Sequence, residues 1–131
     1  MNIGFDFRPE KFASATAYLA ERKPEVTKKE LCKLLYFADK RHLLRYGRTI
    51  TGDKYFALEQ GPIPSNELDA LNGKGKAENI NAVKQYGQLR GWTFKLEHPA
   101  DLRALSKSDL IVLDEILAEM GAVLRIGTLS V

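Results

Sequence analysis

The clearest pattern of apolar and polar positions in the chain lies between Thr27 and Gly47. Thr27 and Glu30 form the Thr-x-x-Glu pattern of a capping box directly before an apolar run, and Gly47 supplies a left-handed end. At about 100° per residue, one stripe collects Leu31, Leu34, Leu35 and Ala38, with Tyr36 and Leu43 on one side and Phe37 and Leu44 on the other. A helix that is apolar over most of its circumference is typical of a central element. The pattern therefore predicts a central buried helix over about 27–46.

Weaker patterns predict further helices on both sides. A helix from about Arg8 to Glu21 has Pro9 in its first turn, where proline is tolerated, and Pro24 stops it. Ser65 begins a short helix through Leu71, and residues 77–88 are helical in part. The last clear helix begins at Ser106 or Ser108, and we expect Gly121 to end it. Its single apolar face comprises Leu110, Leu113, Ile116, Leu117 and Met120.

Two segments have residue patterns that are typical of strands and turns. Tyr55–Leu58 reads as a short strand, and Gly61–Pro64 reads as a stiff connection because Pro62 and Pro64 fix φ at both sites. Residues 91–96 alternate like a half-buried strand, which places Trp92, Phe94 and Leu96 on one face. Together these patterns predict a single domain over 1–131 of the α+β class, mainly α, with a small antiparallel sheet.

The distribution of charge along the chain indicates a charged binding partner. The chain has 131 residues, 44% hydrophobic and 28% charged, as in an ordinary globular protein. Its net charge is only +3, but residues 22–48 hold nine Lys or Arg against three acids, a local balance of +6. Such an uneven field suits a charged protein or a nucleic acid. No apolar run approaches the length of a membrane span, and the first residues lack a signal-peptide pattern, so we expect a cytoplasmic protein.

The side chains and motifs that could support catalysis or hold a cofactor indicate neither an enzyme nor a cofactor site. His42 and His98 are the only histidines, and Cys32 and His42 are separated by about 15 Å of helical rise, so the sequence favours no metal site. We interpret Cys32 and His42 as packed core residues, with Asp39 one turn before the histidine. There is no Gly-x-Ser-x-Gly elbow, and the Gly73–Lys76 stretch lacks the spacing of a phosphate loop.

Nucleic-acid binding remains an alternative at this stage. The basic side chains of the 27–46 helix are able to contact phosphates. However, the sequence contains no assignable recognition helix or single-strand binding pattern. We therefore regard nucleic acid as the less favoured partner.

Five short motifs over residues 33–64 resemble the Panacea domain, the SocA-like antitoxin family whose members are often described as phage-associated. They are Lys33-Leu34-Leu35-Tyr36-Phe37-Ala38, Tyr46-Gly47, Thr51-Gly52-Asp53, Tyr55-Phe56-Ala57 and Gly61-Pro62-Ile63-Pro64. With its flanking helices the resemblance covers residues 8–121. It implies a mostly helical α+β fold and an antitoxin that neutralises a toxin encoded next to it by direct binding. One branch of the family implies an alternative, a proteolytic adaptor that delivers its toxin to a Clp-type protease.

The resemblance also implies a difference at the end of the chain. Members of the family commonly continue past the last helix into a segment with a Thr-His pair. Here the last residues are Gly127-Thr128-Leu129-Ser130-Val131, with no histidine. The resemblance thus predicts a domain that is truncated or shortened at its C-terminus.

We predict the partner site on the segment Thr51–Pro64 and the basic helix before it. A short strand beside a proline-stiffened loop offers a rigid edge for a toxin strand or loop. Alternate residues of a strand face opposite sides, and we expect Tyr55 to be exposed and Phe56 to be buried. The predicted contact residues are Asp53, Tyr55, Pro62 and Pro64, with Lys40, Arg41 and Arg45 as a charged rim. The residues predicted to shape the fold are Lys33, Leu34, Leu35, Tyr36, Gly47, Gly52 and Gly61.

Overall fold

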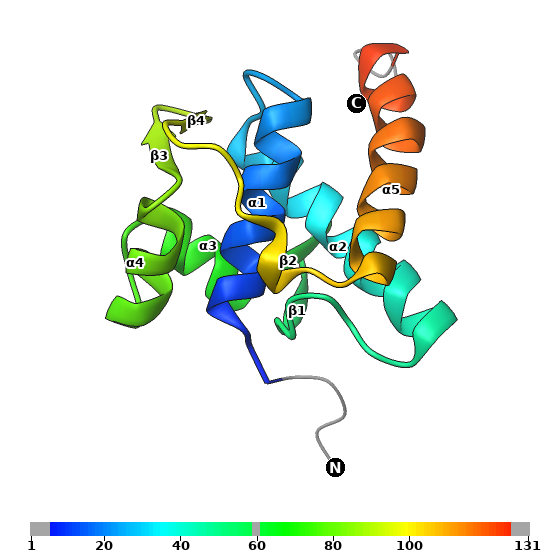
Figure 1. The fold of residues 1–131 in the computed structure, drawn as a ribbon. Helices are drawn as coiled ribbons and strands as arrows, with labels where there is room; N and C mark the ends of the chain where they lie inside the picture. The colour runs from blue at the N-terminus through cyan, green and yellow to red at the C-terminus, as the bar shows by residue number, and fades with distance from the viewer. Residues whose placement is uncertain (1–5, 59–60, 127–131) are drawn as a thin grey trace.

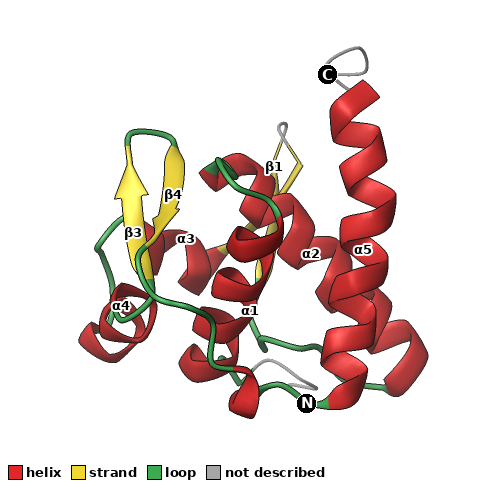
Figure 2. Cartoon of the chain, turned by 45° about the horizontal axis from the view of Figure 1, so that its top comes forward, coloured by secondary structure: helices red, strands yellow, loops and turns green. Residues whose placement is uncertain are grey.

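A computed structural model describes residues 6–58 and 61–126 of the chain, with backbone alone for 56–58, 61–65 and 121–126. The helices are α1 (Pro9–Arg22), α2 (Lys28–Tyr46), α3 (Ser65–Leu71), α4 (Ala77–Lys84) and α5 (Lys107–Ile126), with a 3-10 turn at Leu102–Ala104. The chain also forms two antiparallel hairpins (Figures 1 and 2). In the first, β1 (Tyr55–Leu58) pairs with β2 (Gly61–Pro64), and in the second, β3 (Gly87–Arg90) pairs with β4 (Thr93–Leu96). The α+β, mainly α class is confirmed, with two hairpins among the described residues where one small sheet was predicted.

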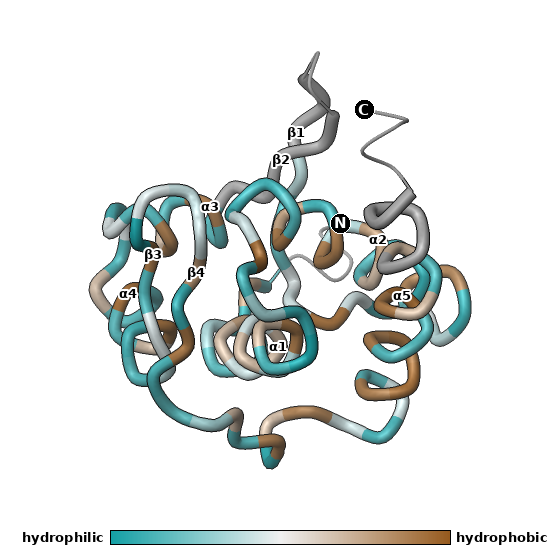
Figure 3. Tube along the Cα trace, turned by 90° about the horizontal axis from the view of Figure 1, so that it is seen from above, coloured by the Kyte–Doolittle hydropathy of each residue, from teal (hydrophilic) through white to brown (hydrophobic). Residues whose placement is uncertain are grey.

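The most completely buried helix is α1, where every residue from 11 to 20 is buried. Seen from above, α1 lies between α4 with the β3–β4 hairpin on one side and α2 with α5 on the other (Figure 3). Four of its buried residues are alanines, Ala13, Ala15, Ala17 and Ala20, and such small side chains allow neighbours to approach from several directions. Helix α2, predicted as the centre, buries one face and leaves Phe37, Leu43 and Leu44 exposed.

Both ends of α2 follow the sequence prediction. The Thr27 hydroxyl accepts the Glu30 amide at 3.1 Å, and a Glu30 carboxylate oxygen accepts the Thr27 amide at 2.9 Å. At the other end Gly47 has φ +82°, and its N–H donates to the Leu43 carbonyl at 2.9 Å. These local contacts satisfy main-chain groups that a helix end leaves unpaired, so they fix where α2 begins and ends.

Three sequence predictions are wrong in detail. Trp92 is 76% exposed, because it lies in the β3–β4 turn, while Phe94 inside β4 is buried as expected. The segment Gly61–Pro64 is strand β2 and pairs with β1. Helix α5 continues through Gly121 to Ile126, since one glycine inside a helix weakens it without ending it.

Candidate partner-binding surface

Carboxyl groups are buried between α2, α3 and the loop that leads into β1. Asp39 on α2 is only 2% exposed and accepts four hydrogen bonds from that loop. Its Oδ1 accepts the main-chain N–H groups of Ile50 at 2.8 Å and Thr51 at 3.0 Å. Its Oδ2 accepts the hydroxyls of Thr51 and Tyr55, each at 2.6 Å. Asp39 therefore fixes the start of the β1–β2 hairpin against α2.

A second buried carboxylate, Asp53, holds the start of α3. Its Oδ1 accepts the N–H of Lys54 at 2.8 Å and both the N–H and the Nδ2 of Asn66 at 2.9 Å. Its Oδ2 accepts the N–H of Glu67 at 2.9 Å. The N–H groups of a first helical turn have no partner within the helix, so Asp53 caps α3 from a distant part of the chain.

The third member of the cluster is Glu67, and its contact with Thr51 needs a proton on a carboxyl group. The Thr51 hydroxyl oxygen lies 2.6 Å from Asp39 Oδ2 and 2.8 Å from Glu67 Oε1, but a hydroxyl has one hydrogen to donate. With that hydrogen on the bond to Asp39, the short contact to Glu67 requires a neutral carboxylic acid that donates to Thr51. Glu67 is fully buried, and its Oε2 has no hydrogen-bond partner among the described residues.

Burial and mutual repulsion explain the protonation of this cluster. Burial raises the pKa of Glu67 well above its ordinary value, and the negative charges of Asp39 and Asp53 raise it further. Burial also raises the pKa of Asp39, while the hydrogen bonds from Thr51 and Tyr55 oppose that effect. In the described ranges no Lys or Arg forms an ion pair with these three carboxyl groups. Closely spaced carboxyl groups without a cation cannot all ionise.

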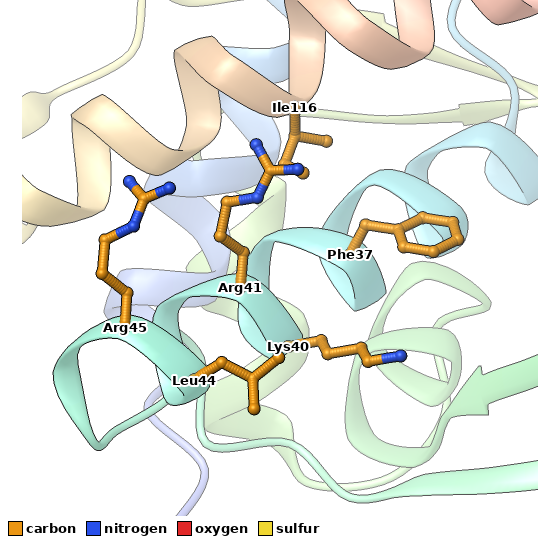
Figure 4. Close-up of a pocket in the computed structure, with 6 residues that line it drawn as sticks. All are labelled: Phe37, Lys40, Arg41, Leu44, Arg45 and Ile116. Carbon is orange, nitrogen blue, oxygen red and sulfur yellow. The ribbon is translucent and has the colours of Figure 1, made fainter.

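A shallow surface lies on the other face of α2, next to α5. It contains a hollow of about 390 Å³ lined by Phe37, Lys40, Arg41, Leu44, Arg45 and Ile116 (Figure 4). Phe37 is 38% exposed and Leu44 78%, although both belong to a helix whose opposite face is core. Exposed apolar side chains that gather at a hollow are typical of a protein-binding surface.

The charges around the hollow differ in how they are paired. Arg41 forms a two-pronged contact with Glu119 at 2.6 Å, and both Arg41 and Arg45 reach Glu115 at 3.0–3.1 Å. These contacts connect α2 to α5. Lys40, in contrast, forms no ion pair with a described carboxylate, and neither do Lys33 on the same helix and Lys54 before β1. The lysines are the charges that remain available to a partner.

Aromatic contacts connect the hairpin to this surface. The Tyr55 ring lies 5.2 Å from the Tyr36 ring, and Tyr36 lies 5.1 Å from Phe37, both edge to face. The Lys40 ammonium lies 6.0 Å from the centre of the Tyr36 ring. We use the name α2–hairpin surface for Lys33, Phe37, Lys40 and Leu44 together with strands β1 and β2.

The structure separates the predicted contact residues into two groups. Lys40, Arg41 and Arg45 lie together on the surface, but Asp53 is fully buried and serves α3. The expectation that Tyr55 is exposed is wrong, because its hydroxyl reaches inward to Asp39. Pro62 and Pro64 lie in β2, where the side chains, like that of Phe56 in β1, are outside the described ones.

The residues predicted to shape the fold lie in different environments. Leu34 and Leu35 are buried, while Lys33 and Tyr36 are half-buried. Gly52 has φ +77°, and a Cβ there would lie 2.0 Å from the Asp6 carbonyl oxygen, so only glycine fits. Gly61 begins β2. The residues that sequence reasoning missed are Asp39 as a hairpin anchor, Thr51 and Glu67.

His42 is a buried packing residue, as interpreted from the sequence, whereas Cys32 is only half-buried. His42 is fully buried, with Nδ1 2.7 Å from the Arg48 carbonyl oxygen and Nε2 2.9 Å from Ser108 Oγ. Its acidic neighbour is Asp109, at 3.2 Å from Nε2, rather than Asp39. Burial lowers the pKa of His42, so the neutral ring donates to Arg48 and accepts from Ser108. Burial raises the pKa of Cys32 to about 12, which keeps the thiol unreactive.

We expect His42→Gln and Cys32→Ala each to lower the free energy of unfolding by about 1–2 kcal/mol, as changes at packed sites do. Affinity for a partner should be unchanged, because neither side chain reaches the α2–hairpin surface. Urea denaturation followed by circular dichroism measures the first effect, and calorimetric titration measures the second. A variant that folds normally but loses binding would make its residue part of a binding site.

The comparison with known families finds a match over most of this chain. The family model described as antitoxin SocA-like, Panacea domain, matches residues 31–125, which include most of α2, both hairpins and most of α5. The chain belongs to this family. No curated protein and no solved structure matches it.

The described residues contain neither a group of metal ligands nor a membrane-spanning helix. No group of three or more His, Cys, Asp or Glu side chains in residues 6–58 and 61–126 is placed to hold a metal ion. In the same part of the chain, no helix combines the length and apolar character needed to cross a bilayer. The membership of an antitoxin-like family indicates a non-enzymatic role.

Proposed function

We propose that this protein is an antitoxin that neutralises a cognate protein toxin by binding it directly at the α2–hairpin surface. Membership of the antitoxin SocA-like family supports an antitoxin role. The observation that carries the proposal is the exposure of Phe37 and Leu44 beside lysines that have no described carboxylate partner. Apolar anchors surrounded by charge are the usual composition of a protein–protein contact.

The arrangement also provides a rigid support for such a contact. Asp39 anchors the start of the hairpin, and Asp53 anchors the start of α3, both through buried hydrogen bonds. A surface that is already ordered loses little conformational freedom when a partner docks. Arg41 and Arg45 strengthen this support by holding α2 against α5.

The test uses the protein encoded by the reading frame adjacent to that of this chain. We expect Lys40→Glu and Leu44→Asp each to weaken its binding by about tenfold or more, since each places a negative charge at the contact. Growth of cells that express both proteins reports neutralisation, and calorimetric titration reports affinity. Inhibition of the toxin in a purified mixture, without a protease, separates direct inhibition from delivery to a Clp-type protease.

Trp92→Ala is the matched control, because Trp92 is as exposed as Leu44 but lies in the β3–β4 turn. This variant should bind and neutralise like the unchanged protein. If Lys40→Glu and Leu44→Asp fold normally and bind equally well, the α2–hairpin surface is not the toxin site. If the unchanged protein does not bind or neutralise its neighbour, the antitoxin proposal fails.

A further inference from the structure

The register of the β1–β2 hairpin determines which main-chain groups face outward. Tyr55 pairs with Pro64, Phe56 with Ile63, Ala57 with Pro62 and Leu58 with Gly61. Hydrogen-bonded pairs alternate with non-bonded pairs along an antiparallel ladder. Proline has no N–H, so the pairs at Pro62 and Pro64 must be the non-bonded ones. The N–H and C=O groups of residues 55 and 57 on β1, and the C=O groups of residues 62 and 64 on β2, therefore face away from the hairpin.

The two outer edges of the hairpin are chemically different. The outer edge of β2 presents carbonyl groups but no N–H, because both outward positions are proline. An edge without donors cannot form a ladder with another strand. The outer edge of β1 presents both the N–H and the C=O of Tyr55 and Ala57. Neither residue forms a main-chain hydrogen bond to a described residue outside the hairpin.

The two strands of the hairpin differ in how they pack against the helices. Strand β2 is the one that packs against α2 and α3, so β1 forms the outer side of the hairpin. The base of β1 is fixed by the bond from the Tyr55 hydroxyl to Asp39. Lys54, directly before β1, is exposed, and Lys40 lies beside the Tyr36 ring that contacts Tyr55. The edge of β1 therefore starts from a fixed residue, and exposed Lys54 places a positive charge directly before it.

We propose that the partner docks by adding an extended, acidic segment to the outer edge of β1. The alternating N–H and C=O groups of Tyr55 and Ala57 specify an extended chain, since only a strand presents complementary groups at that spacing. The charge of Lys54 directly before this edge, with Lys40 on the nearby helix α2, favours acidic residues in the segment. Pro62 and Pro64 ensure that the hairpin accepts a strand on one edge only. This inference rests on the proposed function and names the part of the toxin that is recognised.

The test blocks the outward donor of β1 without disturbing the hairpin. Ala57→Pro removes one outward N–H at a non-bonded position, opposite a position that is already proline. Binding of the protein from the adjacent reading frame should weaken about tenfold or more. Ala57→Val, which keeps the N–H, and Pro62→Ala, which restores a donor to β2, should bind like the unchanged protein. Circular dichroism and thermal melting establish that each variant is folded.

A second measurement needs no variant and no toxin. A short synthetic peptide of alternating threonine and valine, with glutamates at both ends, is titrated into the ¹⁵N-labelled chain. The amides of Tyr55 and Ala57 should shift and become protected from hydrogen exchange, while the same peptide with lysines at both ends should cause smaller shifts. Shifts confined to other amides, or none, would overturn the inference.

The two proposals fail in different ways. If the unchanged chain does not bind the protein from the adjacent reading frame, the antitoxin proposal fails. The peptide titration still tests whether the outer edge of β1 accepts an extended acidic segment. If the neighbour binds but Ala57→Pro folds and binds normally, the edge inference is wrong while the antitoxin proposal stands. A gain in affinity for Pro62→Ala would place the added strand on β2 and would also overturn the inference.

Discussion

Replacement of Asp53 by alanine is expected to lower the free energy of unfolding by about 3–5 kcal/mol, a large change for one residue. The Asp53 carboxylate accepts the main-chain N–H groups of Lys54, Asn66 and Glu67 at 2.8–2.9 Å in a fully buried position. Alanine would leave these three donors without this acceptor, and the bond from Glu67 is fully buried. Asp53→Asn should have a smaller effect, about 1–3 kcal/mol, because one acceptor oxygen remains.

The measurement is urea denaturation of the three proteins, followed by circular dichroism. Asp69→Ala is the matched control, since Asp69 is an exposed acid on the same helix α3 and makes no described side-chain hydrogen bond. Its free energy of unfolding should change by no more than about 0.5 kcal/mol. Equal stability of Asp53→Ala and Asp69→Ala would mean that the start of α3 does not depend on this carboxylate.

The sequence predicts those parts of the fold that depend on neighbouring residues. The capping box of Thr27 and Glu30 and the left-handed Gly47 are local features, and the structure has α2 between them. Strand β1 also falls on Tyr55–Leu58, as the sequence indicates. Such features need only contacts within one turn, so a single sequence contains the information for them.

The parts that sequence reasoning misses depend on residues far apart in the chain. The cluster joins Asp39, Asp53 and Glu67, and each acid taken alone resembles an ordinary surface residue. The expectation of an exposed Tyr55 failed for the same reason, because the acceptor of its hydroxyl lies 16 residues earlier. The central position of α1 was missed because most of its buried residues are small, whereas apolar periodicity gives most weight to large side chains.

The buried carboxyl cluster and the proposed binding edge are connected by the hydrogen bond between Tyr55 and Asp39. Asp39 holds both the loop after α2 and the Tyr55 hydroxyl, and Tyr55 is also the first residue of the edge that we propose accepts a strand. Loss of the bond to Asp39 would free the base of β1. A strand that is not held in place must be ordered when it binds, and this lowers affinity. The charge state of the cluster therefore acts on stability and on binding together.

Glu67→Gln is expected to remove a loss of stability that the unchanged protein shows as the pH rises. Burial, with the charges of Asp39 and Asp53, raises the pKa of Glu67 in the folded chain well above its value in the unfolded chain. Between these two values the folded chain keeps a proton that the unfolded chain releases. The Glu67 contribution therefore falls by about 1.4 kcal/mol per pH unit from the ordinary pKa upward, until the pH passes the folded pKa.

Glutamine should reproduce the neutral side chain, since its Nε2 can donate to the Thr51 hydroxyl where protonated Glu67 does. Denaturation curves at a series of pH values from about 5 to 9 give the difference in unfolding free energy between variant and unchanged protein. That difference should move in favour of Glu67→Gln as the pH rises, while Glu78→Gln, a change at an exposed acid of α4, should show no such trend. A constant difference for Glu67→Gln across this range would mean that Glu67 is ionised in the folded chain. The proton that the Thr51 contact requires would then belong to Asp39, and Asp39→Asn would show the trend instead.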